Sequence, residues 1–200
     1  LSMPDIPSTK AESGEKLERS VWSFRHLKLG IVAIFFYVGV EVCIGNNINL
    51  YVIELQNATG DISFFGHDAL KLFGINFTIP ALAATLYWVS ILIGRLVGSS
   101  LSKVTPRFQL TVVSVLAIVM VSLAIAFNNL WILVAVCLFH SIMWGAIFTL
   151  SIQGLGKYTS KASGVFMIGV VGGAILPLVQ GGFADSLQSW RWTWLIVRAG

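Results

Sequence analysis

Long apolar stretches, separated by short polar segments, dominate the sequence. Five of them are long enough to cross roughly 30 Å of hydrocarbon as helices, which takes about 20 residues. None shows the period-two alternation that marks the strands of a membrane β-barrel. We therefore predict an all-α, polytopic membrane protein. The predicted spans are residues 29–55, 77–101, 108–127, 130–152 and 162–184, and a shorter apolar run from Trp192 is interpreted as the start of a sixth helix, truncated at Gly200.

Composition and charge placement support this prediction. Only 11% of the residues are charged, where a soluble domain has about 25%. Lys and Arg concentrate before the first span, between the second and third, and between the fourth and fifth, which places residues 1–28 on the cytoplasmic side as a linker. Because these basic residues lie at span ends, the net charge of +4 does not indicate a nucleic-acid partner. They are Lys10, Lys16, Arg19, Arg25, Lys28, Arg95, Lys103, Arg107, Lys157 and Lys161.

The first span carries polar residues in its middle, within the stretch 35–52. At about 100° per residue, Tyr37, Glu41 and Asn49 share one arc of an ideal helix, whereas Asn46 points off it unless the helix unwinds. A carboxylate at a span centre costs about 2.5–3.5 kcal/mol on insertion scales, so it usually faces a cavity or a partner. We favour a cavity-facing, substrate-binding Glu41. The alternative is a structural Glu bonded to an adjacent helix.

The fourth span contains one histidine, His140, with Trp144 one turn further on. A lone histidine in a membrane helix often bonds a neighbouring helix, and we weigh this packing role ahead of substrate contact. An aromatic ring beside a polar group nevertheless suits a pyranose, which offers a flat apolar face and several hydroxyls. Both residues are therefore candidates for a sugar site.

The second span ends in a segment with two glycines and two arginines. Gly94 and Gly98 are four residues apart, so they share a face and permit close approach of another helix. Arg95 is expected at the cytoplasmic end, where it can bond helix carbonyls or an acidic partner or extend towards the membrane surface. Arg107 follows in the same basic segment.

The fifth span has a second pair of spaced glycines. Gly169 and Gly173 form a small-xxx-small face, and Pro177 removes one intrahelical hydrogen bond, so we predict a close-packed, kinked helix. The glycine spacing does not fit a dinucleotide-binding fingerprint. The sequence shows no Ser–His–Asp set, no paired carboxylates within one span and no zinc-ligand spacing, so we expect neither an enzyme nor a metal or cofactor.

Four stretches together resemble the fucose/glucose/galactose:proton symporter family of the major facilitator superfamily. They are FFYVGVEVCIGNNINLYVIE, LYWVSILIGRLVGSSLSKVTPR, SIMWGAIFTLSIQGLGKYTSKASG and VVGGAILPLVQGGFAD. The resemblance implies the C-terminal six-helix half of a transporter, whose first and fourth helices line a central cavity. It also implies that Arg95 and Arg107 belong to a cytoplasmic motif that latches the inward face.

The implied function is uptake of fucose, galactose or glucose with protons, by alternating access across a bacterial inner membrane. The implied partners are the sugar, the proton, the lipid bilayer and a missing N-terminal half. Family members usually place their coupling acids in that first half, so Glu41 is open to a role with sugar or with the proton. Two alternatives stay open: a transporter of the same fold for another solute, and a non-transporting membrane interaction protein.

Overall fold

The computed structural model describes residues 20–60, 62–64, 67, 69–72, 74–100 and 104–195. Within this part of the chain, five helical segments are long and apolar enough to cross a membrane. The predicted linker, residues 1–28, lies mainly outside the described residues, and so does the end of the sixth apolar run. The α-helices are α1 (Arg25–Thr59), α2 (Ile79–Ser100), α3 (Pro106–Phe127), α4 (Leu130–Ile152), α5 (Thr159–Phe166) and α6 (Gly172–Leu187).

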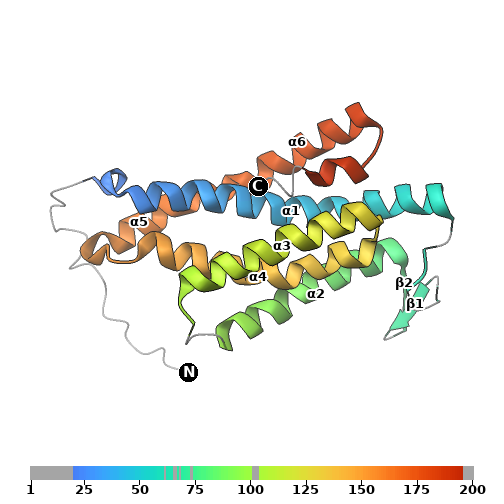
Figure 1. The fold of residues 1–200 in the computed structure, drawn as a ribbon, viewed down its shortest axis with the longest axis horizontal. Coiled ribbons are helices and arrows are strands. Elements are labelled where there is room, and N and C mark those ends of the chain that lie inside the picture. The colour runs from blue at the N-terminus through green and yellow to red at the C-terminus, as the bar shows by residue number, and fades with distance from the viewer. Residues whose placement is uncertain are drawn as a thin grey trace, which may run out of the picture.

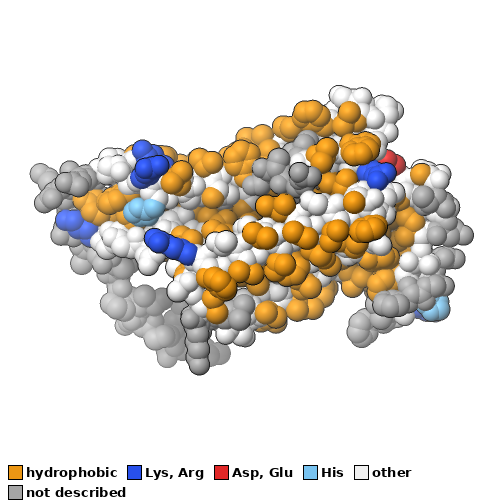
Figure 2. Space-filling view, in the orientation of Figure 1, with side chains coloured by type: hydrophobic (Ala, Val, Ile, Leu, Met, Phe, Trp, Pro, Cys, Tyr) orange, Lys and Arg blue, Asp and Glu red, His pale blue; other side chains and the backbone are white. Residues whose placement is uncertain are grey.

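Two helices form the centre of the bundle. α4 packs against α1, α2 and α3, while α1 packs against α2, α4 and α6, so that α6 lies on the opposite side of α1 from α2–α4 (Figure 1). Large apolar side chains remain exposed along the outer helices; Leu178 on α6 exposes 78% of its surface. Figure 2 shows orange apolar side chains over the middle of the visible face. This distribution is expected where lipid covers the helices.

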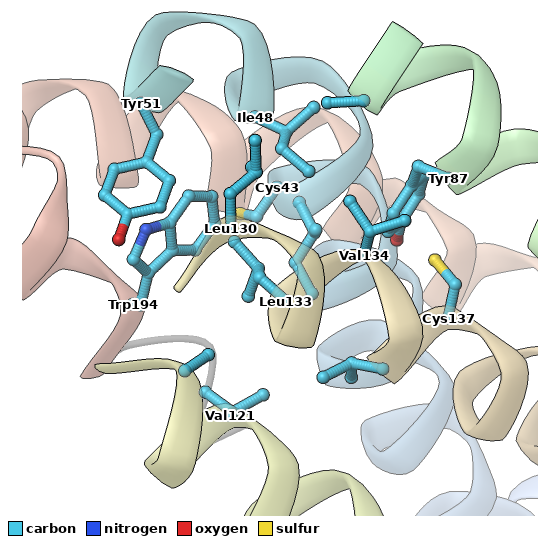
Figure 3. Close-up of a cluster of buried hydrophobic side chains, with 14 of the residues drawn as sticks. Cys43, Ile48, Tyr51, Tyr87, Val121, Leu130, Leu133, Val134, Cys137 and Trp194 are labelled. Atoms are coloured by element: carbon cyan, nitrogen blue, oxygen red, sulfur yellow. The ribbon is translucent and has the colours of Figure 1, made fainter. Parts of the chain in front are cut away.

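The largest core cluster joins α1, α2, α3 and α4 to the segment that follows α6. Figure 3 shows Tyr51 of α1 beside Trp194, with Val121 and Leu133 on the neighbouring helices. The Tyr51 and Trp194 rings meet edge to face, with centroids 5.5 Å apart. Trp194 is 1% exposed, so the segment after α6 is anchored to the bundle by an aromatic side chain.

The connection between α3 and α4 needs only two residues because asparagine suits both helix ends. Asn128 ends α3 in the left-handed conformation, at φ 49°. Asn129 begins α4, and its side-chain oxygen accepts hydrogen bonds from the backbone nitrogens of Trp131 and Ile132. This tight turn makes α3 and α4 antiparallel neighbours.

Two of the predicted elements differ in the structure. The residues before the second span form a hairpin of β1 (Ala69–Leu72) and β2 (Ile75–Thr78), so α2 begins at Ile79 rather than at residue 77. Gly74, at φ 82°, lies in the turn of this hairpin. The chain is therefore not entirely helical, because β-branched and polar residues there pair as strands outside the apolar span.

The fifth span is also not one continuous α-helix. The 3-10 turn η3 (Gly156–Tyr158) precedes α5, and a second 3-10 segment, η4 (Met167–Val171), separates α5 from α6. Gly169 lies within η4, whereas Pro177 lies inside α6. The change in helix geometry therefore comes before the proline. A 3-10 stretch within a helix often marks a hinge or local strain.

Candidate functional site

Three of the predicted site residues come together between α1 and α4. Tyr37 and Glu41 lie one turn apart on α1 and are 4% and 7% exposed, and His140 of α4 is 5% exposed. The Tyr37 and His140 rings meet edge to face, with centroids 6.2 Å apart. A phenol, a carboxylate and an imidazole thus share one buried position in the middle of the bundle.

Two polar atoms of this cluster have unused hydrogen-bonding capacity. His140 Nδ1 and the Tyr37 hydroxyl are buried, and neither makes a hydrogen bond of ordinary geometry with the described residues. The Glu41 carboxylate is nevertheless close enough to interact with that hydroxyl. Because buried polar atoms are nearly always hydrogen-bonded in native proteins, such atoms point to a partner. A ligand with several hydroxyl groups would supply one.

Arg95 brings a positive charge to the same cluster. Its Nη2 atom lies 3.7 Å from Oε1 of Glu41, and the side chains of Arg95 and Glu41 are 56% and 9% exposed. From the sequence, Arg95 was predicted to belong to the cytoplasmic latch, with helix carbonyls, an acidic group or the membrane surface as its possible partners. In the structure the acidic partner is the carboxylate of the candidate binding site.

Two aromatic residues of α2 hold α1 in place beside this ion pair. The Tyr87 hydroxyl donates a hydrogen bond to the backbone carbonyl of Glu41, at 2.7 Å. A Cβ atom at Gly45 would come within 2.8 Å of the Trp88 ring and 2.9 Å of the Tyr87 ring. Gly45 therefore permits the α1–α2 contact, and α1 continues through it without unwinding.

Gly94 and Gly98 place α2 directly on α4. A Cβ atom at Gly94 would lie 2.7 Å from the backbone carbonyl oxygen of Leu138 and 1.9 Å from Oγ of Ser141. Gly98 is less constrained, since its Cβ would lie 3.1 Å from Ile142. This close contact holds the backbone on both sides of Arg95 against α4.

A cleft of about 440 Å³ opens beside this contact. It is lined by residues of α2, α3 and α4, including Arg95, Ser141, Trp144 and Thr149. The half-buried Trp144 stacks on Phe148, with ring centroids 5.5 Å apart and 19° between the planes. Arg95 thus borders both the cleft and Glu41, while Trp144 lies on the cleft side.

The candidate asparagines of α1 occupy different surroundings. Asn46 is exposed, because the helix continues through Gly45 and keeps Asn46 on another face from Glu41. Asn49 is half-buried, and its Oδ1 atom is buried without a hydrogen bond to the described residues. Asn49 lies two turns beyond Glu41 on the same arc, so it extends the polar face of α1 along the helix.

A polar network that was not predicted from the sequence begins at Asn47. The Asn47 side-chain nitrogen donates to Oε1 of Gln180, at 2.8 Å, and the Gln180 nitrogen donates to Oγ1 of Thr193, at 3.1 Å. Gln180 is fully buried. The only indication in the sequence was an amide side chain inside an apolar span, and this does not predict which residue the amide contacts. The network connects α1, α6 and the 3-10 turn η5 (Arg191–Thr193).

Glu54, near the end of α1, was also missed as a structural residue. Its carboxylate accepts hydrogen bonds from the Ser189 hydroxyl, at 2.8 Å, and from the backbone nitrogen of Trp190. Arg191 donates two hydrogen bonds to the carbonyl oxygen of Ile125 on α3. The turn after α6 is therefore bound to both α1 and α3.

The second arginine of the predicted latch lines a different groove from the first. Arg107 lines a separate groove of about 500 Å³, together with His26, Ser151 and Gln153. Most of the visible Lys and Arg side chains in Figure 2 gather at this end, where α1 and α3 begin. A common motif for Arg95 and Arg107 stays a prediction, because in the described residues they line different clefts.

The glycines of the fifth span pack against α1. A Cβ at Gly169 would lie 2.6 Å from the carbonyl oxygen of Ile31, and one at Gly173 would lie 2.9 Å from Val38. The tightest contact involves Gly172, whose Cβ would lie 2.0 Å from the carbonyl oxygen of Phe35. Gly172 was not among the glycines predicted to pack closely.

Curated proteins and solved structures similar to this chain are transporters. No family model matches the chain. The chain is 32% identical over 191 residues to a glucose/galactose transporter of Brucella abortus, and 35% identical over 193 residues to a putative glucose/galactose transporter of Helicobacter pylori. Each match covers 94% of this chain and 43% of the relative.

Solved structures give the same result. The chain superimposes on a major facilitator superfamily transporter, FucP, in the outward conformation, with a TM-score of 0.72 and 26% identity. That match covers 88% of this chain and 39% of FucP. The chain belongs to the major facilitator superfamily. A structure of the Escherichia coli fucose:proton symporter FucP matches with a TM-score of 0.70 and 24% identity, which supports the fold.

Within the major facilitator superfamily, this chain corresponds to the C-terminal half of the sugar transporters. It spans less than half the length of the curated relatives named above. The relatives are named as transporters, and the apolar helices make the chain a multi-pass membrane protein. In the described residues, no group of three or more His, Cys, Asp or Glu side chains could hold a metal ion.

Proposed function

We propose that this chain forms the C-terminal half of a transporter that carries a monosaccharide across a membrane by alternating access. The observation that supports this most directly is the cluster of Tyr37, Glu41 and His140. It combines a carboxylate with two buried polar atoms that have no ordinary hydrogen-bond partner in the described residues. A pyranose hydroxyl can donate to a carboxylate and accept from a phenol, so a sugar would complete the hydrogen bonds of this cluster.

The sugar site would be formed by the facing surfaces of two halves. We propose that an N-terminal half covers the cluster and the adjoining cleft, with the stacked rings of Trp144 and Phe148 available to the apolar face of the sugar. Asn49 is a further candidate hydrogen-bonding residue, and Asn46 is the weakest of the six candidates because it lies off the Glu41 arc. The names of the two bacterial relatives favour glucose or galactose, and FucP favours fucose.

We further propose proton symport across a bacterial inner membrane, with residues 1–28 in the cytoplasm. The name of FucP as a fucose:proton symporter and the placement of Lys and Arg at alternate span ends support these points. The cluster itself contains a titratable carboxylate and an imidazole, either of which could exchange protons. The described helices supply the wall of the site, and coupling requires the complete transporter.

Uptake measurements test this function. Cells that express the complete transporter, meaning this half joined to its N-terminal half, are given labelled glucose, galactose or fucose, with and without an imposed proton gradient. We expect saturable uptake of at least one sugar and its loss when a protonophore collapses the gradient. Uptake that is unchanged by the protonophore would refute proton coupling but not sugar transport. If none of the three sugars is taken up by a transporter that reaches the membrane, the monosaccharide proposal is wrong.

Two other functions remain as outcomes of the same experiment. A transporter of this fold for another solute would leave all three sugars outside but take up a different compound. A membrane interaction protein would transport nothing, and Glu41→Gln would then change only stability. The unpartnered Nδ1 atom of His140 favours the transporter over the interaction protein, because a purely structural contact would normally satisfy it.

A further inference from the structure

The geometry of α1 and α2 directs Glu41 and Arg95 toward each other. The two helices are antiparallel and are connected through the hairpin (Figure 1). Side chains on a helix lean toward its N-terminus. The Glu41 side chain therefore leans toward the start of α1, and the Arg95 side chain leans in the opposite direction along the bundle. This arrangement lets an arginine near the end of α2 reach a carboxylate in the middle of α1.

The resulting ion pair is loose. The separation of 3.7 Å between Arg95 Nη2 and Glu41 Oε1 exceeds the length of a charge-assisted hydrogen bond, about 2.7–2.9 Å. More than half of the Arg95 side chain is exposed, so its guanidinium can leave Glu41 without losing a buried environment. The Glu41 side chain, in contrast, is buried in the bundle.

The backbone at Arg95 is fixed, so the movable part is the side chain. Gly94 is pressed against the Leu138 carbonyl and Ser141 of α4, and any displacement of α2 would disturb that contact. The cleft between α2, α3 and α4 lies beside Arg95 and offers the exposed Thr149 and the half-buried Trp144 on its α4 wall. A guanidinium released from Glu41 would enter this cleft.

We infer that Arg95 is a displaceable counter-charge for Glu41, which occupies the carboxylate when no sugar is bound and moves into the cleft when a sugar hydroxyl takes its place. A hydroxyl donating to an ionised carboxylate forms one of the stronger hydrogen bonds, whereas a partly exposed ion pair contributes little. Arg95 is then a positioning residue: the location of its guanidinium, near the end of α2, depends on whether sugar is bound. The inference rests on the proposed sugar site.

A thiol introduced into the cleft can detect the arrival of the guanidinium. Gly145 lines the cleft and is exposed, and a Cβ atom there meets nothing within 4 Å, so Gly145→Cys fits without repacking. Gly164, on α5, is equally exposed and open but does not line the cleft, so Gly164→Cys is the matched control. The native Cys43 and Cys137 are buried and provide little background.

The experiment compares anionic and cationic methanethiosulfonate reagents of similar size on the complete transporter, with and without a transported sugar. For Gly145→Cys, we expect sugar to raise the ratio of anionic to cationic reaction rates several-fold, because a positive charge attracts the anionic reagent. The ratio should stay unchanged for Gly164→Cys, and also for Gly145→Cys combined with Arg95→Gln. An unchanged ratio for Gly145→Cys alone would overturn the inference.

Uptake by the same variants separates this inference from the proposed function. If the unmodified transporter carries none of the sugars, the proposed function itself is wrong. If uptake is normal but the reagent ratio does not respond to sugar, only the role of Arg95 is wrong. Should Gly145→Cys fail to reach the membrane, Thr149→Cys, at an exposed residue of the same cleft, replaces it.

Kinetics give a second readout that a structural role would not produce. Removing the competitor by Arg95→Gln should lower the apparent KM for sugar several-fold and also lower the maximal rate, whereas Arg95→Lys should restore both toward normal. A higher KM in Arg95→Gln, like that expected for Glu41→Gln, would show that Arg95 supports sugar binding instead of competing with it. Arg25→Gln, at an exposed arginine at the start of α1 and outside both the cluster and the predicted latch, is the charge-matched control.

Discussion

The side-chain nitrogen of Asn47 donates a hydrogen bond to Oε1 of Gln180 at 2.8 Å, joining residues 133 positions apart on α1 and α6. Gln180 passes the connection on to Thr193, whose hydroxyl also donates to the carbonyl oxygen of Trp190. A fully buried amide thus holds the two helices and the following turn in one register. This contact is independent of the candidate sugar site and gives the first prediction.

Gln180→Leu should destabilise the bundle. The substitution keeps most of the side-chain volume but removes the Gln180 partner of the half-buried Asn47 amide and one of the two hydrogen bonds of the Thr193 hydroxyl. A buried polar group left without a partner costs about 1–3 kcal/mol. Water or lipid headgroups can replace part of the lost hydrogen bonding, so we expect the loss in unfolding free energy to lie near the lower end of this range. Thermal unfolding in detergent measures it, with Gln153→Leu at an exposed position as control. Equal stability of the two variants would show that the network contributes nothing.

Gly172→Ala should separate α1 from α6. The added methyl group would lie 2.0 Å from the Phe35 carbonyl oxygen, and this backbone atom cannot rotate away. Overpacking of this kind typically costs about 1–3 kcal/mol. Gly164→Ala, where the methyl group meets no atom within 4 Å, is the control and should be neutral or slightly stabilising. Comparison of the melting temperatures of the two variants in detergent tests the contact.

The helical class could be predicted from the sequence because an apolar run of about 20 residues has few structural alternatives in lipid. Glu41 and His140 could be selected for the same reason, since ionisable groups are conspicuous in such runs. What the sequence did not reveal depends on distances between helices. The partner of Glu41 proved to be Arg95, and only the antiparallel packing of α1 on α2 brings the two together.

The details of the fifth span show a second limit. A four-residue spacing selected Gly169 and Gly173, and both pack on α1, but the tightest approach is at Gly172, directly after the 3-10 segment η4. Helical spacing assumes a constant rotation, so it is reliable only where the helix is regular. The hairpin before α2 was missed for a related reason, since the pattern of its short strands merged into the following apolar run.

Glu41→Gln should weaken sugar binding in the complete transporter. Glutamine keeps the shape of the side chain but replaces a charged acceptor, and a hydrogen bond to a charged group contributes about 1.5–3 kcal/mol. We therefore expect the apparent KM for the transported sugar to rise about tenfold or more, since 1.4 kcal/mol corresponds to a factor of ten. Asp185→Asn, at an exposed position on α6, controls for the loss of one carboxylate.

The same variant separates three roles of Glu41. If Glu41 only packs against other helices, the substitution leaves KM unchanged and alters the melting temperature. If Glu41 carries the proton, the substitution abolishes gradient-driven accumulation, while exchange of labelled for unlabelled sugar continues. A sugar-binding residue raises the KM of exchange and of gradient-driven uptake together, and this is the result that the Tyr37–Glu41–His140 cluster leads us to expect.

His140→Phe distinguishes packing from sugar contact at the other side of the cluster. His140 Nδ1 is buried and makes no hydrogen bond with the described residues. Replacing the imidazole by a phenyl ring therefore breaks no hydrogen bond of this atom and removes a buried polar group. Replacing an unsatisfied polar group by an apolar one is neutral or stabilising. We therefore expect an unchanged or higher melting temperature together with an apparent sugar KM raised several-fold. His26→Phe, at an exposed histidine, should change neither quantity. A lower melting temperature with normal uptake would assign His140 to helix packing, as the sequence alone had favoured.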